Sequence, residues 1–177
     1  QTSTNINGRL SLVADKPDKD NKTPQFLLMN DGENAFPWVV LVGGPFTLKN
    51  ISFSALNATT KSNDAWQHLV HHTAGDGSTY IDGCYFENWN ANLIKVTNGG
   101  NRFYLTNNFF SDGGAGWPSN WQGNFLNSED KLLDSLVMQN NTFINSPGQF
   151  LNIRKQMTKY VDISHNTLIN NGGYPFF

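Results

Sequence analysis

An apolar pattern that occurs five times constrains the fold of this chain more than any other feature of its sequence. The clearest copy spans residues 135–145 and reads SLVMQNNTFIN. Each copy has a large apolar anchor, and the anchors are 33, 24, 33 and 25 residues apart: Phe53, Phe86, Phe110, Phe143 and Leu168. Repeats of this length are typical of solenoid proteins, in which each unit buries its apolar face only against its neighbours.

The spacing inside the copies predicts two short strands joined by a corner. Residues seven and five positions before the anchor alternate with polar residues, as Leu136 and Met138 do before Phe143, and this is the period of a half-buried strand. The last three copies carry an asparagine two residues before the anchor, and asparagine tolerates a positive φ. Stacking would place these amides about 4.8 Å apart, where they can form a hydrogen-bonded ladder. They are Asn108, Asn141 and Asn166.

A second apolar pattern follows four of the anchors and predicts a third strand. Its central residues are expected to point into the core: Val70, Ile94, Leu126 and Leu151. The residues on either side are expected on the outer face: Leu69, Leu93, Phe125 and Phe150 before them, and His71, Lys95, Asn127 and Asn152 after them. Extra residues separate the two patterns after Phe53 and Phe110, which predicts long loops at residues 54–67 and 111–123, on one edge.

The copies at residues 136–143 and 161–168 resemble the rungs of right-handed parallel β-helices of the pectate-lyase-like superfamily. Residues 150–154 resemble a segment of secreted bacterial β-helix domains of unknown function. The resemblance covers residues 46–168 and implies an all-β fold, a right-handed parallel β-helix (solenoid) of about six rungs with two long loops on one edge. It is specific for the fold and nearly silent about activity.

We expect residues 1–177 to form one domain, in which residues 46–177 hold the regular rungs. Residues 1–45 contain apolar runs at 10–13, 26–29 and 38–42, and they are expected to form one or two irregular N-terminal rungs. A single helical turn is expected at residues 129–134. The chain begins with Gln1 and has no polar cap after its last copy, so we expect part of a longer chain or a subunit that stacks on a neighbour.

Composition argues against several classes of protein. Charged residues make up 15% of the chain and its net charge is −2, which predicts no binding of nucleic acid. No apolar run approaches 18 residues, so no membrane insertion is expected. The 25 asparagines accompany 13% aromatic residues, a combination that indicates a folded core with many corners. The single cysteine, Cys84, is expected to be a buried structural thiol.

The tryptophans suggest a site for carbohydrate. Four of them lie between the anchors and the third strands, and stacking would gather them on one edge: Trp66, Trp89, Trp117 and Trp121. Indole faces stack on sugar rings while nearby amides bind the hydroxyls. The predicted carbohydrate site therefore comprises these four residues with Asn127 and Asn152. The alternative interpretation is that each indole fastens its own loop to the wall of the solenoid.

A polar column suggests a second possibility, a polysaccharide lyase. Such an enzyme needs a base to remove the proton α to a uronate carboxyl and a cation to stabilise the enolate. The candidates are His71, Lys95, Arg154 and Lys155, and the alternative is an ordinary solvated face of a sheet.

Comparison with the lyases of this superfamily argues against catalysis. Alginate-lyase and chondroitinase-B types carry acidic metal ligands before a catalytic lysine and an arginine on the next rung. No acidic residue precedes Lys155 here, and the following copy has no arginine. His68, His71 and His72 cluster without an acidic or cysteine partner nearby, so neither a metal nor a cofactor is expected.

The sequence therefore predicts a secreted or cell-surface β-helix module that interacts with polysaccharide without catalysis of its own. One alternative is a structural subunit of an extracellular filament or a larger β-helix assembly, stacked end to end. The other is a fragment of a polysaccharide lyase or glycoside hydrolase.

Overall fold

The computed structural model describes residues 9–14, 25–27, 36–42, 44–54, 66–73, 75, 77–89, 92–113, 124–129, 131–145, 150–154 and 158–171. Within these ranges the side chains of residues 10, 25–27, 36–42, 54, 66–69 and 129 are left undescribed. The described residues form β-strands and contain no helix, which confirms the predicted all-β class.

The strands are short and follow one another along the whole chain. They are β1 (Leu10–Val13), β2 (Gln25–Leu27), β3 (Phe36–Val42), β4 (Phe46–Lys49), β5 (Ser52–Ser54), β6 (Trp66–His72), β7 (Ser78–Asp82), β8 (Tyr85–Glu87), β9 (Asn92–Val96), β10 (Asn101–Thr106), β11 (Phe109–Ser111), β12 (Leu126–Glu129), β13 (Leu133–Gln139), β14 (Thr142–Ile144), β15 (Leu151–Ile153), β16 (Tyr160–Ser164) and β17 (Thr167–Ile169).

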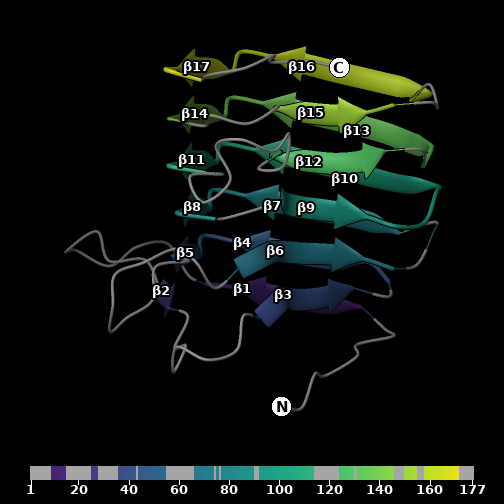
Figure 1. The fold of residues 1–177 in the computed structure, drawn as a ribbon, viewed down its shortest axis with the longest axis horizontal. Coiled ribbons are helices and arrows are strands. Elements are labelled where there is room, and N and C mark those ends of the chain that lie inside the picture. The colour runs from purple at the N-terminus through teal and green to yellow at the C-terminus, as the bar shows by residue number, and fades with distance from the viewer. Residues whose placement is uncertain are drawn as a thin grey trace.

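These strands form three parallel sheets in which each strand pairs with the strand three places later in the sequence. The first sheet has the order β1-β4-β7-β10-β13-β16, the second β2-β5-β8-β11-β14-β17 and the third β3-β6-β9-β12-β15. We call three consecutive strands, one from each sheet, a tier. Figure 1 shows the tiers stacked from β1–β3 at one end to β16 and β17 at the other. The N-terminal strands β1, β2 and β3 thus form a complete first tier, and their bounds overlap the apolar runs predicted at residues 10–13, 26–29 and 38–42.

The anchors of the repeat form one column through the second sheet, as predicted. Pairing aligns Phe53 with Phe86, Phe86 with Phe110, and so on through Phe143 to Leu168. Neighbouring rings stack with centroids 5.3, 5.2 and 4.7 Å apart and with planes within 8° of parallel. Each ring therefore covers the faces of its neighbours, which accounts for the burial of all four phenylalanines to 3% exposure or less.

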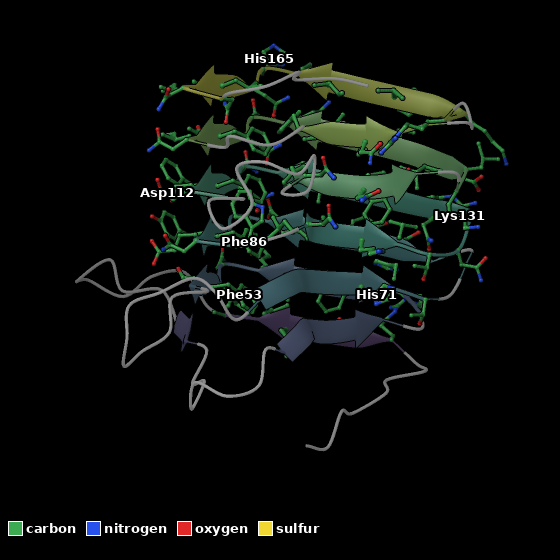
Figure 2. The ribbon with its side chains drawn as sticks, viewed as in Figure 1. Phe53, His71, Phe86, Asp112, Lys131 and His165 are labelled. Carbon is green, nitrogen blue, oxygen red and sulfur yellow. The ribbon has the colours of Figure 1, made fainter. Side chains whose placement is uncertain are left out.

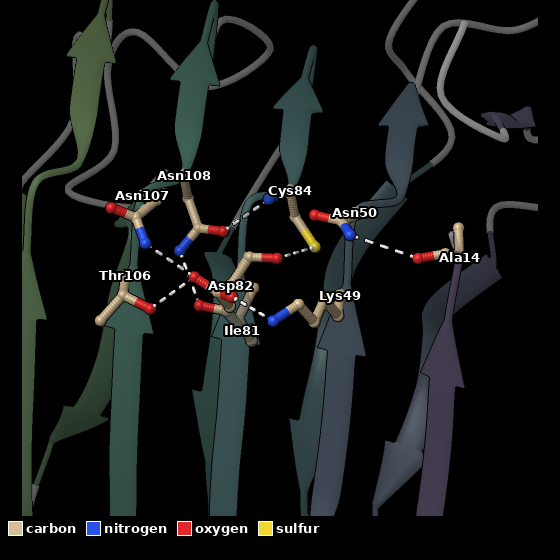
Figure 3. A network of polar contacts seen from close by, with 9 residues as sticks. All are labelled: Ala14, Lys49, Asn50, Ile81, Asp82, Cys84, Thr106, Asn107 and Asn108. Carbon is tan, nitrogen blue, oxygen red and sulfur yellow. Dashed lines mark hydrogen bonds and ion pairs between the residues drawn. The ribbon is translucent and has the colours of Figure 1, made fainter. Parts of the chain in front are cut away.

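The predicted asparagine ladder is confirmed at the corner between the first two sheets. Asn108 Nδ2 donates to Asn141 Oδ1 at 3.0 Å, and Asn141 Nδ2 donates to Asn166 Oδ1 at 2.9 Å. At the lower end Asn108 Oδ1 accepts a hydrogen bond from the backbone N of Cys84 at 2.9 Å (Figure 3). The Cys84 thiol is buried, as predicted, and burial raises its pKa to about 11. The ladder satisfies amides that would be costly to bury alone.

A second use of asparagine explains why the chain has so many. The residue that follows β4, β7, β10, β13 and β16 in the first sheet has a positive φ: Asn50, Gly83, Asn107, Asn140 and His165. The residue that follows β8, β11, β14 and β17 in the second sheet also has a positive φ: Asn88, Asp112, Asn145 and Asn170. Asparagine, aspartate and glycine adopt this left-handed conformation at the lowest cost. His165 is therefore a corner residue, at the position that Asn107 and Asn140 hold in the two preceding copies.

The structure corrects two details of the predicted elements. Residues 129–134 do not form a helical turn, because Glu129 ends β12 and Leu133 begins β13, with a turn in which Lys131 N donates to Ser128 O at 2.8 Å. Residues 66 and 67 belong to β6 and not to a loop. Both predicted long loops do join the second sheet to the third, but residues 55–65 and 114–123 lie outside the described residues. No described helix is long and apolar enough to cross a membrane.

Candidate functional site

The structure brings the predicted polar column together on the third sheet. Register pairing places His71 beside Lys95, Lys95 beside Asn127, and Asn127 beside Asn152. Neighbouring strands are about 4.8 Å apart, so the column runs along the direction in which the tiers stack. Arg154 follows directly after β15, and Lys155 lies outside the described residues. Figure 2 shows His71 on β6, at the lower part of this sheet.

Asparagine side chains connect the upper part of the column into a chain of hydrogen bonds. Asn127 Nδ2 donates to Asn92 Oδ1 at 3.3 Å, and Asn152 Nδ2 donates to Asn127 Oδ1 at 3.3 Å. Arg154 Nε then donates to Asn152 Oδ1 at 2.6 Å. Asn124 Nδ2 also donates to Asn92 Oδ1, at 2.8 Å. The hydrogen bond to Asn152 holds the Nε end of the Arg154 guanidinium in place. This bond is charge-assisted and is therefore stronger than a hydrogen bond between neutral groups.

Burial changes the role expected for two predicted sugar contacts. Asn127 is 6% exposed and Asn152 is 1% exposed, so their amides face protein partners instead of solvent. Asn152 instead accepts a hydrogen bond from Arg154, and Asn127 accepts one from Asn152. Sequence reasoning did not find Asn92 and Asn124, although both stand three residues before a column position, Lys95 and Asn127, and this shared spacing was the available signal.

The prediction of which apolar residues of the third sheet face the core was correct for one set of residues and wrong for another. Val70, Ile94, Leu126 and Leu151 point inward and are buried, as expected. Leu93, Phe125 and Phe150 were expected outside but are at most 2% exposed, and Phe125 contacts the rings of Phe110 and Phe143 edge to face. The chain turns into the sheet at these residues, so two consecutive side chains face the core and strict alternation begins only afterwards. The Leu69 side chain is outside the described residues.

Of the four tryptophans predicted to form an exposed edge, the structure describes the side chain of Trp89 alone, and that indole is buried. Trp89 is 2% exposed and meets the Phe110 ring edge to face at 6.5 Å, so its indole belongs to the core. The backbone of Gly113 lies against it and leaves no room for a side chain at that position. This fits the alternative interpretation, in which an indole fastens its own segment. Trp66 lies in β6 with its side chain undescribed, and Trp117 and Trp121 are outside the described residues.

Charge distinguishes the polar column from the opposite side of the molecule. On the first sheet Lys49 pairs with Asp82 at 3.0 Å, and Asp134 pairs with Arg102 at 2.8 Å and with Lys159 at 2.7 Å. In the described part of the chain no carboxylate lies within 4.0 Å of Lys95 or Arg154. These two cations therefore have no compensating carboxylate among the described side chains, an arrangement that attracts anions.

His71 is neutral at pH 7 in this setting. Burial, and then the charge of Lys95, lower the pKa of its imidazole. Its Nε2 lies 3.1 Å from Thr97 Oγ1 and shares a hydrogen bond with it. The column thus offers one neutral imidazole and two cations, which suits the binding of an anion with hydroxyl groups nearby.

His72, the next residue, points into the core. It is 1% exposed, its Nε2 lies 2.6 Å from Thr79 Oγ1, and its ring meets Phe103 edge to face at 5.2 Å. Burial, and then the neighbouring His71, lower the pKa of His72 to about 4. His72 is therefore a neutral core residue and not a member of the exposed column.

Because the imidazole of His72 is buried, we expect the free energy of unfolding to depend on pH. The folded-state pKa of His72 is below its value of 6.5 in the unfolded chain, so the unfolded chain takes up the proton first as pH falls. We expect the free energy of unfolding to decrease by up to about 3 kcal/mol between pH 6.5 and pH 4. Urea unfolding across this range measures it. His72→Gln should flatten the dependence while His71→Gln keeps most of it, and an unchanged slope in His72→Gln would contradict this assignment.

Comparison with known proteins adds no relative. No family model matches the chain, and no curated protein or solved structure matches it either. Among the described residues, no group of three or more His, Cys, Asp or Glu side chains is arranged to hold a metal ion.

Proposed function

We propose that the stacked tiers form a right-handed parallel β-helix of six rungs and that its third-sheet face binds an acidic polysaccharide without catalysis by this chain. The pairing of every strand with the strand three places later supports a coil, since each turn would then contribute one strand to each sheet. Connections between parallel strands of one sheet are right-handed in nearly all proteins, which supports the handedness. This is the fold of the pectate-lyase-like superfamily that the repeat resembles.

The observation that carries the proposed function is a line of cations, Lys95 and Arg154, that have no carboxylate partner among the described side chains. Lys95 and Arg154 stand two tiers apart, about 10 Å along the stacking direction. A polymer lying along that direction would meet both charges in turn, with the imidazole of His71 one tier further. Carboxylates of uronic acids are suitable partners, because guanidinium and ammonium groups bind them with charge-assisted hydrogen bonds. The polymer would lie outside the cell, so we propose a secreted or cell-surface location.

Binding without chemistry fits the groups that the face presents. A lyase needs a base free to reach the proton α to the carboxyl, and the Nε2 of His71 is already hydrogen-bonded to Thr97. The asparagines between the two cations are covered and hydrogen-bonded to one another, so they hold the face rigid. Each ion pair contributes little to the affinity, but a polymer with many carboxylates would form several such pairs at once and therefore bind more tightly.

Affinity electrophoresis in gels containing polygalacturonate tests this function. Replacing both cations, Lys95→Gln with Arg154→Gln, should raise the apparent dissociation constant about tenfold, because two solvent-exposed ion pairs of about 0.7 kcal/mol each are lost. Raising the salt concentration should have a similar effect on the unmodified protein.

The matched control replaces two cations on the first sheet that already have carboxylate partners, Lys49→Gln with Arg102→Gln. This variant should bind polygalacturonate as the unmodified protein does, and neither protein should be retarded by neutral dextran. Equal retardation of the third-sheet variant and the unmodified protein would refute the proposal. Release of unsaturated uronates, seen by ultraviolet absorbance, would show that the chain is a lyase.

A further inference from the structure

The last tier exposes two apolar residues, Val161 and Leu168, whose described counterparts in the other tiers are buried. Val161 is 50% exposed in β16, whereas Leu136, its partner in β13, is fully buried. Leu168 is 39% exposed in β17, whereas its partner Phe143 is 1% exposed. Ile169 is 49% exposed beside it. Val161 and Leu168 belong to columns whose other described members are buried, whereas Ile169 lies above Ile144, which is half-buried.

The asparagine ladder ends at the same face with an altered pattern of hydrogen bonds. Asn141 Nδ2 donates to Leu105 O one tier below and to Asn166 Oδ1 one tier above. Asn166 Nδ2 makes the bond below, to Met138 O at 2.7 Å, but its second bond turns back to Ser164 O in its own tier. The backbone N of Asn141 donates to Asn166 Oδ1, and no described group accepts the corresponding bond from Asn166 N.

We propose that the edge formed by β16 and β17 binds a strand–corner–strand segment that carries the repeat pattern of this chain. An asparagine of the incoming segment would lie over Asn166 and accept the bond from its backbone N. Apolar residues seven, five and zero positions from the incoming anchor would cover Val161, Ile163 and Leu168. Parallel strands added to β16 and β17 would pair the open backbone groups of both edges, as in β-strand addition by peptides.

The ladder distinguishes this partner from the first tier of a second copy. The position equivalent to Asn166 in the first tier is two residues before Phe26, and it holds Pro24. Proline has neither a side-chain amide nor a backbone N–H, so a head-to-tail contact between copies would leave the ladder unextended. A segment with the asparagine in place satisfies both the apolar columns and the ladder.

Titration of the full chain with a fluorescent peptide tests this binding site. The peptide has the sequence of residues 135–145, SLVMQNNTFIN, and binding is read by fluorescence anisotropy. We expect saturable binding, and about tenfold weaker binding by the same peptide with Asn141→Leu, because at least one buried hydrogen bond is lost. A scrambled peptide of the same composition should not bind.

Substitutions in the protein locate the site. Leu168→Asp should abolish peptide binding, whereas Val13→Asp, at a 60% exposed apolar residue of the first tier, should leave it unchanged. Val13→Asp should unfold with heat as the unmodified protein does, and Leu168→Asp should unfold at a slightly lower temperature, because Leu168 is only 39% exposed and lies over Phe143. Lys95→Gln with Arg154→Gln should bind peptide normally, which separates this site from the polysaccharide face.

Three results would overturn the proposal. The first is the absence of saturable binding up to the solubility limit of the peptide. The second is binding of the Asn141→Leu or the scrambled peptide that is as tight as binding of the unmodified peptide. The third is concentration-dependent association of the unmodified chain, lost in both Leu168→Asp and Val13→Asp, without peptide binding, which would identify a second copy as the occupant.

Discussion

Replacement of Asn141 by leucine is expected to lower the free energy of unfolding by about 3 to 5 kcal/mol. Asn141 is 1% exposed, and its Oδ1 accepts bonds from the backbone N and the Nδ2 of Asn108. Its Nδ2 donates to Leu105 O and to Asn166 Oδ1. Leucine has a similar size but leaves these buried groups without partners, and each such group costs about 1 to 3 kcal/mol. Urea unfolding measures the loss.

Asn98→Ala is the matched control for this experiment. Asn98 is exposed and its Oδ1 accepts a bond only from the adjacent Gly99 N, which water can replace. The control should change stability by no more than about 0.5 kcal/mol. If Asn141→Leu costs less than about 1 kcal/mol, the ladder does not stabilise the corner in the way its geometry indicates.

Phe110→Ala is expected to cost about 3 to 5 kcal/mol, a loss of the same size. The Phe110 ring stacks between Phe86 and Phe143 and meets Phe125 and Trp89 edge to face. Its removal leaves a cavity that the neighbouring tiers cannot fill, because each is held in register by its own strands. Thermal and urea unfolding should both report the change.

The adjacent residue provides the control for this cavity. Phe109 points to the other face of β11, is only half-buried, and stacks on Tyr85 at 5.1 Å. Phe109→Ala should therefore cost about 1 kcal/mol, because the ring loses one aromatic partner and little burial. Equal losses for the two variants would mean that the inward column is not the core of the molecule.

The stacking could be predicted because residues at the same position of successive copies have the same size or chemistry, and such residues form one column when the copies stack. Phe53, Phe86 and Phe110 mark one column by their size, and Asn108 and Asn141 mark another by their chemistry. The same reasoning placed His71, Lys95, Asn127 and Asn152 in one line, since pairing across a parallel sheet keeps the sequence offset of each copy.

The sequence did not show which members of that line stay exposed. Alternation predicts two faces within a strand, but Phe125 lies where the chain enters the sheet, and there two neighbouring side chains point inward. Exposure of Asn127 and Trp89 depends on segments far away in the sequence that cover them, so no local pattern could reveal it. The predicted aromatic sugar site loses Trp89, which is buried, and stays a prediction for Trp66, Trp117 and Trp121, whose side chains lie outside the described residues.

Distance measurement between spin labels tests the stacking of the tiers most directly. Nitroxides at Thr47 and Asp162 are 115 residues apart in sequence but four strand spacings apart in one register column of the first sheet. The native Cys84 is buried with a pKa of about 11 and should resist labelling. Double electron–electron resonance should give a distance centred near about 19 Å. A distance beyond about 30 Å, which exceeds six strand spacings, would contradict the stacked arrangement.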